Sequence, residues 1–157
     1  MSNKKNSNDN IIDNNKSVYH HYEVLETVVA GISLEGNEVK SLRLNSASLK
    51  GSFCKFFNND LFLMDLNIKI LTTTNSWKNT EADRARQLLM TRKELKKWQV
   101  KVNQDGLTIM PIKLFFNERN YCKIVVGLCK GKKLHDKRES LKKKDLNRQA
   151  ERDLKNY

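Results

Sequence analysis

The chain of 157 residues carries 30 Lys and Arg against 18 Asp and Glu, a formal net charge of +12 with a pI near 9.7. This length predicts one domain with its own core, and the excess of cations favours a polyphosphate partner, with a membrane surface as the rival. No apolar run approaches the roughly 20 residues of a transmembrane helix, so we expect no membrane span. Residues 1–18 are rich in asparagine and predict a disordered arm rather than a secretory signal.

Strand and helix patterns then follow along the chain. Residues 22–34 are rich in β-branched and aromatic side chains and predict a strand, whereas 37–44 predict a short helix over a barrel mouth or sheet edge. Residues 52–68 predict two antiparallel strands, because the Asn-Asn-Asp stretch at 58–60 tolerates the positive φ of a tight turn. The first half of the chain is therefore expected to be mainly β.

A long helix is predicted after this hairpin. Thr80 and Asp83 stand in the spacing of a capping box, which marks a helix start. The apolar residues that follow recur mostly on one helical face. They are Ala82, Ala85, Leu88, Leu89, Leu95 and Trp98.

A second hairpin completes the body. Residues 107–116 and 121–129 predict its strands, and Pro111 marks an edge position or a bulge because it cannot donate a hydrogen bond. The order of elements predicts a mainly β fold with helices, a small antiparallel β-barrel of the oligonucleotide-binding type over 19–130. A flatter α+β sheet is the alternative.

Residue types that are able to carry out catalysis or to bind metals are scattered along the chain. Three cysteines without a CxxC spacing argue against a disulfide framework and a zinc site, and fit a reducing cytosol. Cys122 and Cys129 are interpreted as buried, inert thiols, and His20 and His21 as solvated. We therefore expect no enzyme, no metal and no cofactor. An RNA-processing enzyme would need clustered carboxylates or a His/Lys site in the body.

The cations carry more information. A single surface cation is ordinarily just solvated, but this set predicts salt-sensitive phosphate contacts, with Arg92, Lys93, Lys96 and Lys97 adding to the charge of the long helix. Exposed aromatic rings would add stacking on RNA bases, from Trp77, Tyr121 or His135, whereas core packing is favoured for Tyr22. The cations proposed for RNA binding are Lys40, Arg43, Arg84, Arg86, Lys130, Lys132 and Lys133.

The last segment, 131–157, carries ten Lys and Arg against five Asp and Glu and contains no proline. Its few apolar residues favour a helix that has little to bury. We expect this tail to be disordered in the free chain and helical when bound.

Four blocks in collinear order resemble the SsrA-binding protein (small protein B) family. They are GNEVKSLR at 36–43, RARQLLMTRKEL at 84–95, GLTIMPIKLFF at 106–116 and CKGKKLHDKRE at 129–139. The resemblance covers about residues 19–155. It implies a cytoplasmic, monomeric protein that grips the tRNA-like part of tmRNA. With elongation factor Tu and GTP, it would help deliver the charged RNA to stalled ribosomes for trans-translation.

The resemblance also implies roles for particular residues. Leu89 and Lys123 match family positions that contact tmRNA, and 131–133 match a hinge. The tail would enter the decoding centre and the empty mRNA channel, against small-subunit rRNA. The matching tail residues are His135, Asp136, Lys137 and Arg138.

Two stretches depart from the family pattern. Val29 stands where the family commonly has a glutamate, which removes one expected contact. Thr80, Ala82 and Gln87 replace the usual His, Pro and basic residue near the long helix. The alternative function is a general RNA-binding module of the translation apparatus, initiation-factor-like or ribosomal.

Overall fold

The computed structural model describes residues 10–69 and 84–155, with the backbone alone at 134–136. The helices are α1 (Ser17–His21), α2 (Gly36–Arg43), α3 (Arg92–Asp105) and α4 (Leu134–Lys155). The strands are β1 (Ile11–Asn14), β2 (Tyr22–Ile32), β3 (Ala47–Ser48), β4 (Phe53–Phe57), β5 (Asp60–Met64), β6 (Asn67–Ile68), β7 (Arg86–Leu89), β8 (Thr108–Phe116) and β9 (Cys122–Gly131).

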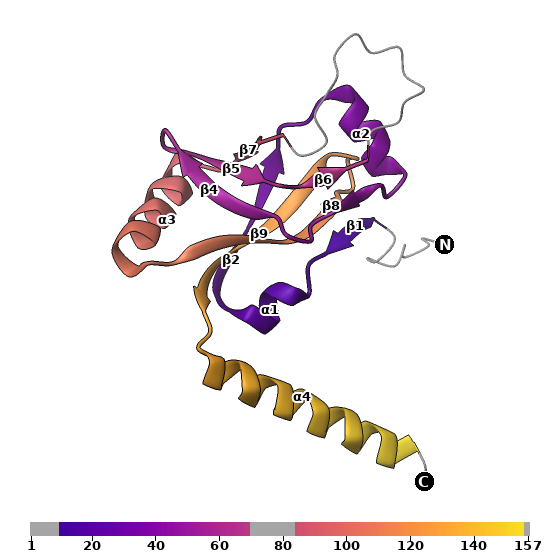
Figure 1. Cartoon of the computed structure of the whole chain (residues 1–157). Coiled ribbons are helices and arrows are strands. Elements are labelled where there is room, and N and C mark those ends of the chain that lie inside the picture. Colours follow the sequence, from indigo (N-terminus) through magenta and orange to yellow (C-terminus); the bar gives the residue numbers. More distant parts are fainter. Residues whose placement is uncertain (1–9, 70–83, 156–157) are drawn as a thin grey trace.

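Seven strands form one antiparallel sheet in the order β1-β8-β4-β5-β7-β2-β9, and β3 pairs separately with β6. A further pairing joins β8 to β9, so six strands make a continuous circuit of pairing, with β1 added outside β8. Figure 1 shows these strands wrapped around one another, with α3 at one end of the body and α2 at the other. The mainly β fold with helices is confirmed.

Alternation along the strands explains the core. In β5 the burial pattern places Leu61 and Leu63 inward, and both are fully buried. Trp98 of α3 is also fully buried and belongs to the same apolar cluster, so this helix packs against the sheet. The turn between β4 and β5 uses Asn58 and Asn59 at φ of 48° and 67°, which confirms the predicted hairpin.

The predicted start of the long helix is wrong. Residues 86–89 form strand β7, which pairs with β5 and β2, and α3 begins only after its N-cap, Thr91. The capping box is formed by Thr91 and Glu94, whose side chains bond each other's backbone amides. Thr80 and Asp83 lie outside the described residues. A short apolar run fits the periodicity of a helix as well as that of a strand, and pairing with β5 and β2 makes this one a strand.

The prediction of a disordered arm over 1–18 is wrong for its described part, from residue 10 onward. β1 pairs with β8, and the Asp13 carboxylate accepts a hydrogen bond from the Leu49 amide at 2.7 Å. Val18 is 1% exposed and packs against Ile112 and Cys129. A few apolar residues are enough to order this polar stretch, because it can pair with an edge of β8 that is otherwise unpaired.

Pro111 lies at an irregularity, as predicted. The register between β8 and β9 shifts between Pro111 and Lys113. The Asn15 side-chain amide donates to the Pro111 carbonyl at 3.2 Å, so the segment after β1 bonds the main chain at this bulge. The segment interpreted as a loose arm thus takes part in the fold.

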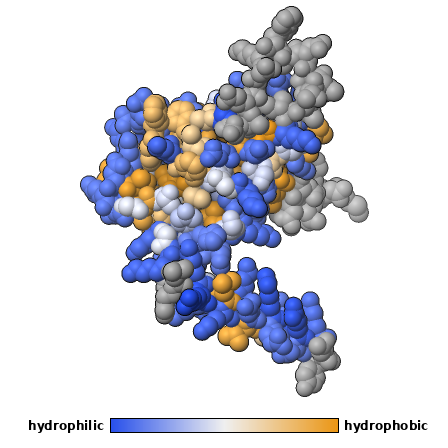
Figure 2. All heavy atoms as spheres, viewed as in Figure 1, coloured by the Kyte–Doolittle hydropathy of each residue, from blue (hydrophilic) through white to orange (hydrophobic). Residues whose placement is uncertain are grey.

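The tail differs from its expected disorder. Residues 134–155 form helix α4, which leads away from the sheet (Figure 1). No proline or glycine interrupts this segment, and its residues are mostly good helix formers. Figure 2 shows a mostly hydrophilic surface on this helix with few apolar side chains. Leu141, Leu146 and Leu154 are 45%, 70% and 78% exposed, so the helix has little apolar packing of its own.

Candidate nucleic-acid interface

Three strands bring the two main predicted contact residues into one row. Gly31 of β2 lies opposite Leu89 of β7 on one side and opposite Lys123 of β9 on the other. Directly paired residues point to the same face of a sheet, so Leu89 and Lys123 flank Gly31 on one face. A Cβ at Gly31 would meet the Leu89 Cβ at 3.1 Å, and glycine is what lets Leu89 lie this close.

A hollow of about 390 Å³ opens at this row, which we name the Leu89 hollow. Leu89 is 56% exposed and Tyr121 is 64% exposed, both unusually high for apolar or aromatic side chains of a sheet protein. No carboxylate of the described residues lines it, whereas two cations do. Its lining is Gly31, Ile32, Leu34, Val39, Arg43, Leu89, Asn120, Tyr121, Cys122 and Lys123.

Helix α2 supplies Arg43, and a buried ion cluster anchors this helix. Glu38 is fully buried, and its carboxylate accepts bonds from Arg84 at 2.7 Å and from Arg86 at 2.8 Å. Arg86 also donates to the Leu66 carbonyl at 2.8 Å. The cluster thus joins α2 to β7 and to the chain before β6, which places Arg43 beside Leu89 on a rigid support.

The charges of this cluster stabilise one another. Burial works to raise the pKa of Glu38, but hydrogen bonds from Arg84, the Glu35 amide and Arg86 hold it below its ordinary value. The hydrogen bond to Glu38 likewise raises the pKa of Arg84. The carboxylate therefore stays ionised inside the protein.

Two of the cations predicted to bind RNA are bonded to the buried Glu38 carboxylate. The Arg86 side chain is 0% exposed, because β7 directs Arg86 and Leu88 inward and Leu89 outward. Arg84 retains 27% exposure, but its guanidinium is bonded to both Glu38 oxygens. A buried guanidinium needs a partner, so both arginines hold α2, and the fully buried Arg86 does not face a surface ligand. An RNA contact of Arg84 stays a prediction.

The remaining predicted cations lie in two places. Lys40 and Arg43 are exposed on α2, whereas Lys130 and Lys133 are exposed where the chain leaves β9. Lys132 is half-buried, and its ammonium donates to the Tyr19 carbonyl at 3.1 Å and to Ser140 at 3.0 Å. The structure therefore groups Arg43 with Lys123 and separates both from the cations at the tail.

The cations of α3 belong to a third region, and several have carboxylate partners. Glu26 accepts bonds from Lys97 at 2.7 Å and Lys101 at 3.2 Å, and Arg92 lies 3.1 Å from Asp60. The hydrogen bond from Lys97 is the main cause that lowers the pKa of Glu26. These pairs are exposed and sit away from the Leu89 hollow.

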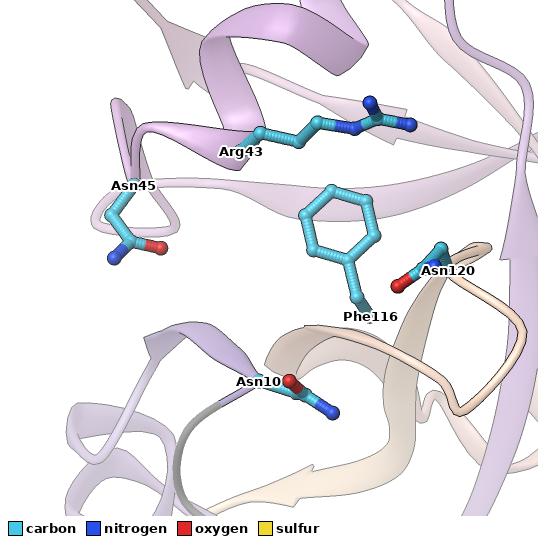
Figure 3. Close-up of a pocket in the computed structure, with 5 residues that line it drawn as sticks. All are labelled: Asn10, Arg43, Asn45, Phe116 and Asn120. Carbon is cyan, nitrogen blue, oxygen red and sulfur yellow. The ribbon is translucent and has the colours of Figure 1, made fainter.

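A second hollow of about 370 Å³ adjoins the first and shares Arg43 and Asn120 with it. We name it the Phe116 hollow. Figure 3 shows the Phe116 ring at its centre with the Arg43 side chain extending across one side of it. Three amide side chains surround the ring, from Asn10, Asn45 and Asn120.

The tail residues matched to the decoding centre all lie in the first turns of α4. Lys137 is half-buried and lines a hollow beneath β4, β8 and α1, whereas Arg138 is exposed. His135 and Asp136 are helical, and their side chains lie outside what the structure describes. No described side chain of this group reaches the Leu89 hollow.

Val29 lies on the same face as the Leu89 hollow, two residues before Gly31, and is 58% exposed. A glutamate here would point outward, beside the row of Leu89 and Lys123. Of the proposed stacking rings, Tyr121 is exposed, and Tyr22 is half-buried against the small cluster around Val18, as predicted. Trp77 lies outside the described residues.

The thiols are poor nucleophiles. Burial raises the pKa of Cys122 to about 12 and of Cys129 to about 11, and it raises that of Cys54 further. Over 10–69 and 84–155, no three His, Cys, Asp or Glu side chains gather as a metal site. No described helix is both long and apolar enough to cross a membrane. The described part of the chain thus offers an apolar and cationic face as its main candidate site.

The family model described as SmpB protein matches residues 12–156, which is nearly the whole chain. The chain belongs to the SmpB protein family. The resemblance read from the four sequence blocks is thereby confirmed. The match begins within β1, so the segment interpreted as a disordered arm is partly a family element.

Relatives with the family name cover almost the full length. The SsrA-binding protein of Sulfurovum sp. (strain NBC37-1) is 48% identical over 94% of this chain and 96% of its own. That of Helicobacter pylori (strain Shi470) is 44% identical over 94% and 97%. A solved structure, "tmRNA-SmpB: a journey to the center of the bacterial ribosome", is 43% identical with a TM-score of 0.62, covering 78% of this chain and 85% of that one.

The sequence did not single out three residues that shape the candidate site. Glu38 shares the buried face of α2 with Ser41 and Leu42, at i, i+3 and i+4, a spacing that was visible in the sequence. Phe116 and Asn120 come at the end of β8 and in the following turn. Their only sequence signal is an aromatic residue close to a polar turn, which does not distinguish a hollow from an ordinary hairpin.

Proposed function

We propose that this chain binds the tRNA-like part of tmRNA and takes part in trans-translation on stalled ribosomes. The observation that carries the proposal is the Leu89 hollow, where exposed apolar side chains meet two cations, with no carboxylate among the described residues that line it. Its support from relatives is their name, SsrA-binding protein, and the tmRNA–SmpB ribosome structure.

The chemistry of the hollow suits folded RNA with exposed bases. Lys123 and Arg43 supply charge for phosphates, the salt-dependent part of binding. Leu89 and Tyr121 offer an apolar surface on which a sugar or an unstacked base can pack. Backbone pairing across β7, β2 and β9 holds this surface in place before RNA arrives.

The finer assignments belong to the same proposal. The circuit of six strands is of the oligonucleotide-binding barrel type. The protein acts as a monomer without a cofactor, in the cytoplasm where ribosomes are, and it performs no catalysis. It delivers its RNA together with elongation factor Tu.

The tail has a separate role in this proposal. α4 is basic, exposed and almost free of body contacts, so it can reach into a channel while the body holds RNA. Its first turns, which contain residues 135–138, occupy the decoding centre against small-subunit rRNA, and the rest follows the empty mRNA channel. The exposed cations at Lys130 and Lys133 lie where the two parts join.

A competition assay tests the function. The full chain is expected to prefer the tRNA-like part of tmRNA to bulk tRNA at 0.15 M salt. Lys123→Ala weakens this binding and lowers the slope of log affinity against log salt by about one unit, because one phosphate contact is lost. Lys96→Ala on exposed α3 is the matched control and leaves the affinity nearly unchanged. Equal binding of both RNAs would instead favour a general RNA-binding module.

A further inference from the structure

The Phe116 hollow has a composition unlike an ordinary solvated dent. Among the described residues, its lining combines one aromatic ring, one guanidinium and three amides, with no carboxylate (Figure 3). The Arg43 guanidinium makes no ion pair with any other described residue. A ring, a planar cation and amides are the groups that proteins use to hold an unstacked RNA base.

Two of the amides stand on fixed turns. Asn45 ends α2 at a φ of 53°, where its own amide donates to the Leu42 carbonyl at 3.0 Å. Asn120 has a φ of 61° in the β8–β9 turn, and its amide donates to the Asn117 carbonyl at 3.0 Å. Because the backbone is held at both positions, little backbone entropy is lost when their side chains bind a ligand.

The third side of the hollow is also held by main chain. The Phe116 amide donates to the Asn10 carbonyl at 2.9 Å, which joins the chain before β1 to the end of β8. Phe116 itself is half-buried and packs partly against the main core. One side of the ring is therefore supported by the core, while the ring also lines the hollow.

The position of the hollow identifies the source of the ligand. It shares Arg43 and Asn120 with the Leu89 hollow, so an RNA strand that crosses one hollow continues onto the other. We propose that the Phe116 hollow holds one unstacked base of the same RNA, stacked on Phe116 and hydrogen-bonded at its edge by Asn45 and Asn120. This inference rests on the proposed function, since the RNA is the one bound at Leu89 and Lys123.

The test compares variants of the full chain with the tRNA-like RNA. Phe116→Leu removes the ring and keeps an apolar side chain, and it is expected to weaken binding about 5- to 100-fold. The salt slope should not change, because no phosphate contact is lost. Phe116→Tyr keeps the ring and restores affinity. Phe57→Leu is the matched control, since Phe57 is 64% exposed and lines neither hollow.

The amides are tested without disturbing the backbone. Glycine accepts positive φ, so Asn45→Gly and Asn120→Gly remove only the side chains. Each is expected to weaken binding about 2- to 10-fold. Asn45 and Asn120 are exposed, so these two variants still test the inference if Phe116→Leu lowers the melting temperature. A loss of RNA affinity in them cannot be ascribed to a damaged core.

A scan of the RNA identifies the base. Single abasic nucleotides are placed through the unpaired positions, and one of them should bind wild type and Phe116→Leu equally well. An equal deficit of Phe116→Leu on every abasic RNA, or no deficit from any of the variants, would overturn the inference while a weakened Lys123→Ala upheld the proposed function. If the wild-type chain does not prefer this RNA, the proposed function fails and the inference fails with it.

Discussion

Glu38 is a buried carboxylate whose Oε1 accepts from both Arg84 and Arg86, while its Oε2 accepts from Arg84 and from the Glu35 amide. Glu38→Gln keeps the shape but removes the buried negative charge that both guanidinium groups contact, and we expect a loss of about 3 kcal/mol of unfolding free energy at pH 7. Denaturant unfolding measures this. Glu26→Gln is the control, because Glu26 also accepts from two lysines but is only half-buried, and the change should cost about 1 kcal/mol or less.

The contribution of Glu38 to stability has a defined pH dependence. The pKa of Glu38 is lowered in the folded state, so its contribution is complete above the ordinary value, about 4.3, and is lost as the pH falls through the folded pKa. The stability difference between wild type and Glu38→Gln should therefore shrink below pH 4. A difference that stayed constant down to pH 2 would contradict an ionised Glu38.

Val29 allows a gain-of-contact test beside the proposed RNA site. It is 58% exposed next to the row of Leu89 and Lys123, so Val29→Glu places its carboxylate in solvent and should leave the melting temperature unchanged. If RNA donates a hydrogen bond there, binding tightens about 10-fold, since bonds to charged groups contribute about 1.5 kcal/mol. Val29→Gln separates hydrogen bonding from charge. Weaker binding with Glu alone would show phosphate repulsion instead.

At the scale of elements, α4 is the part whose function depends on shape. Its leucines are mostly exposed, so helix propensity rather than packing maintains it. Leu146→Pro should break the helix at a cost of about 3 kcal/mol without changing the charge. We expect loss of peptide tagging on stalled ribosomes with RNA binding by the body retained. Leu146→Ala, which keeps the helix, is the control, and normal tagging by the proline variant would reduce the tail to an electrostatic tether.

At the scale of the whole molecule, truncation of the two chain ends should affect stability differently. A chain ending at Lys133 loses only α4, so its melting temperature and RNA affinity should stay close to wild type. Removing residues 1–14 deletes β1 and the Asp13–Leu49 bond and should cost about 2 kcal/mol, or about 5 °C. Calorimetry of both chains decides this, and an N-terminal deletion that melts like wild type would contradict a structural β1.

The sequence was sufficient where local patterns are unambiguous. The two hairpins and the irregularity at Pro111 were predicted and found, and the short helix predicted at 37–44 was found at 36–43. Turn residues with positive φ and a residue that lacks an amide hydrogen limit the backbone within a few positions. The excess of cations and the four sequence blocks likewise indicated RNA binding and the family.

Partners distant in the chain decided the rest. Residues 86–89 suit a helix locally, but pairing with β5 and β2 made them a strand, and this turned Leu89 outward and buried Arg86. A cation far along the sequence from Glu38 has no local signal of being its partner. The Leu89 and Phe116 hollows also depend on β-sheet register, because a shift of one residue would exchange exposed and buried side chains. Composition therefore predicted the kind of partner, and only the tertiary pairing determined which residues face it.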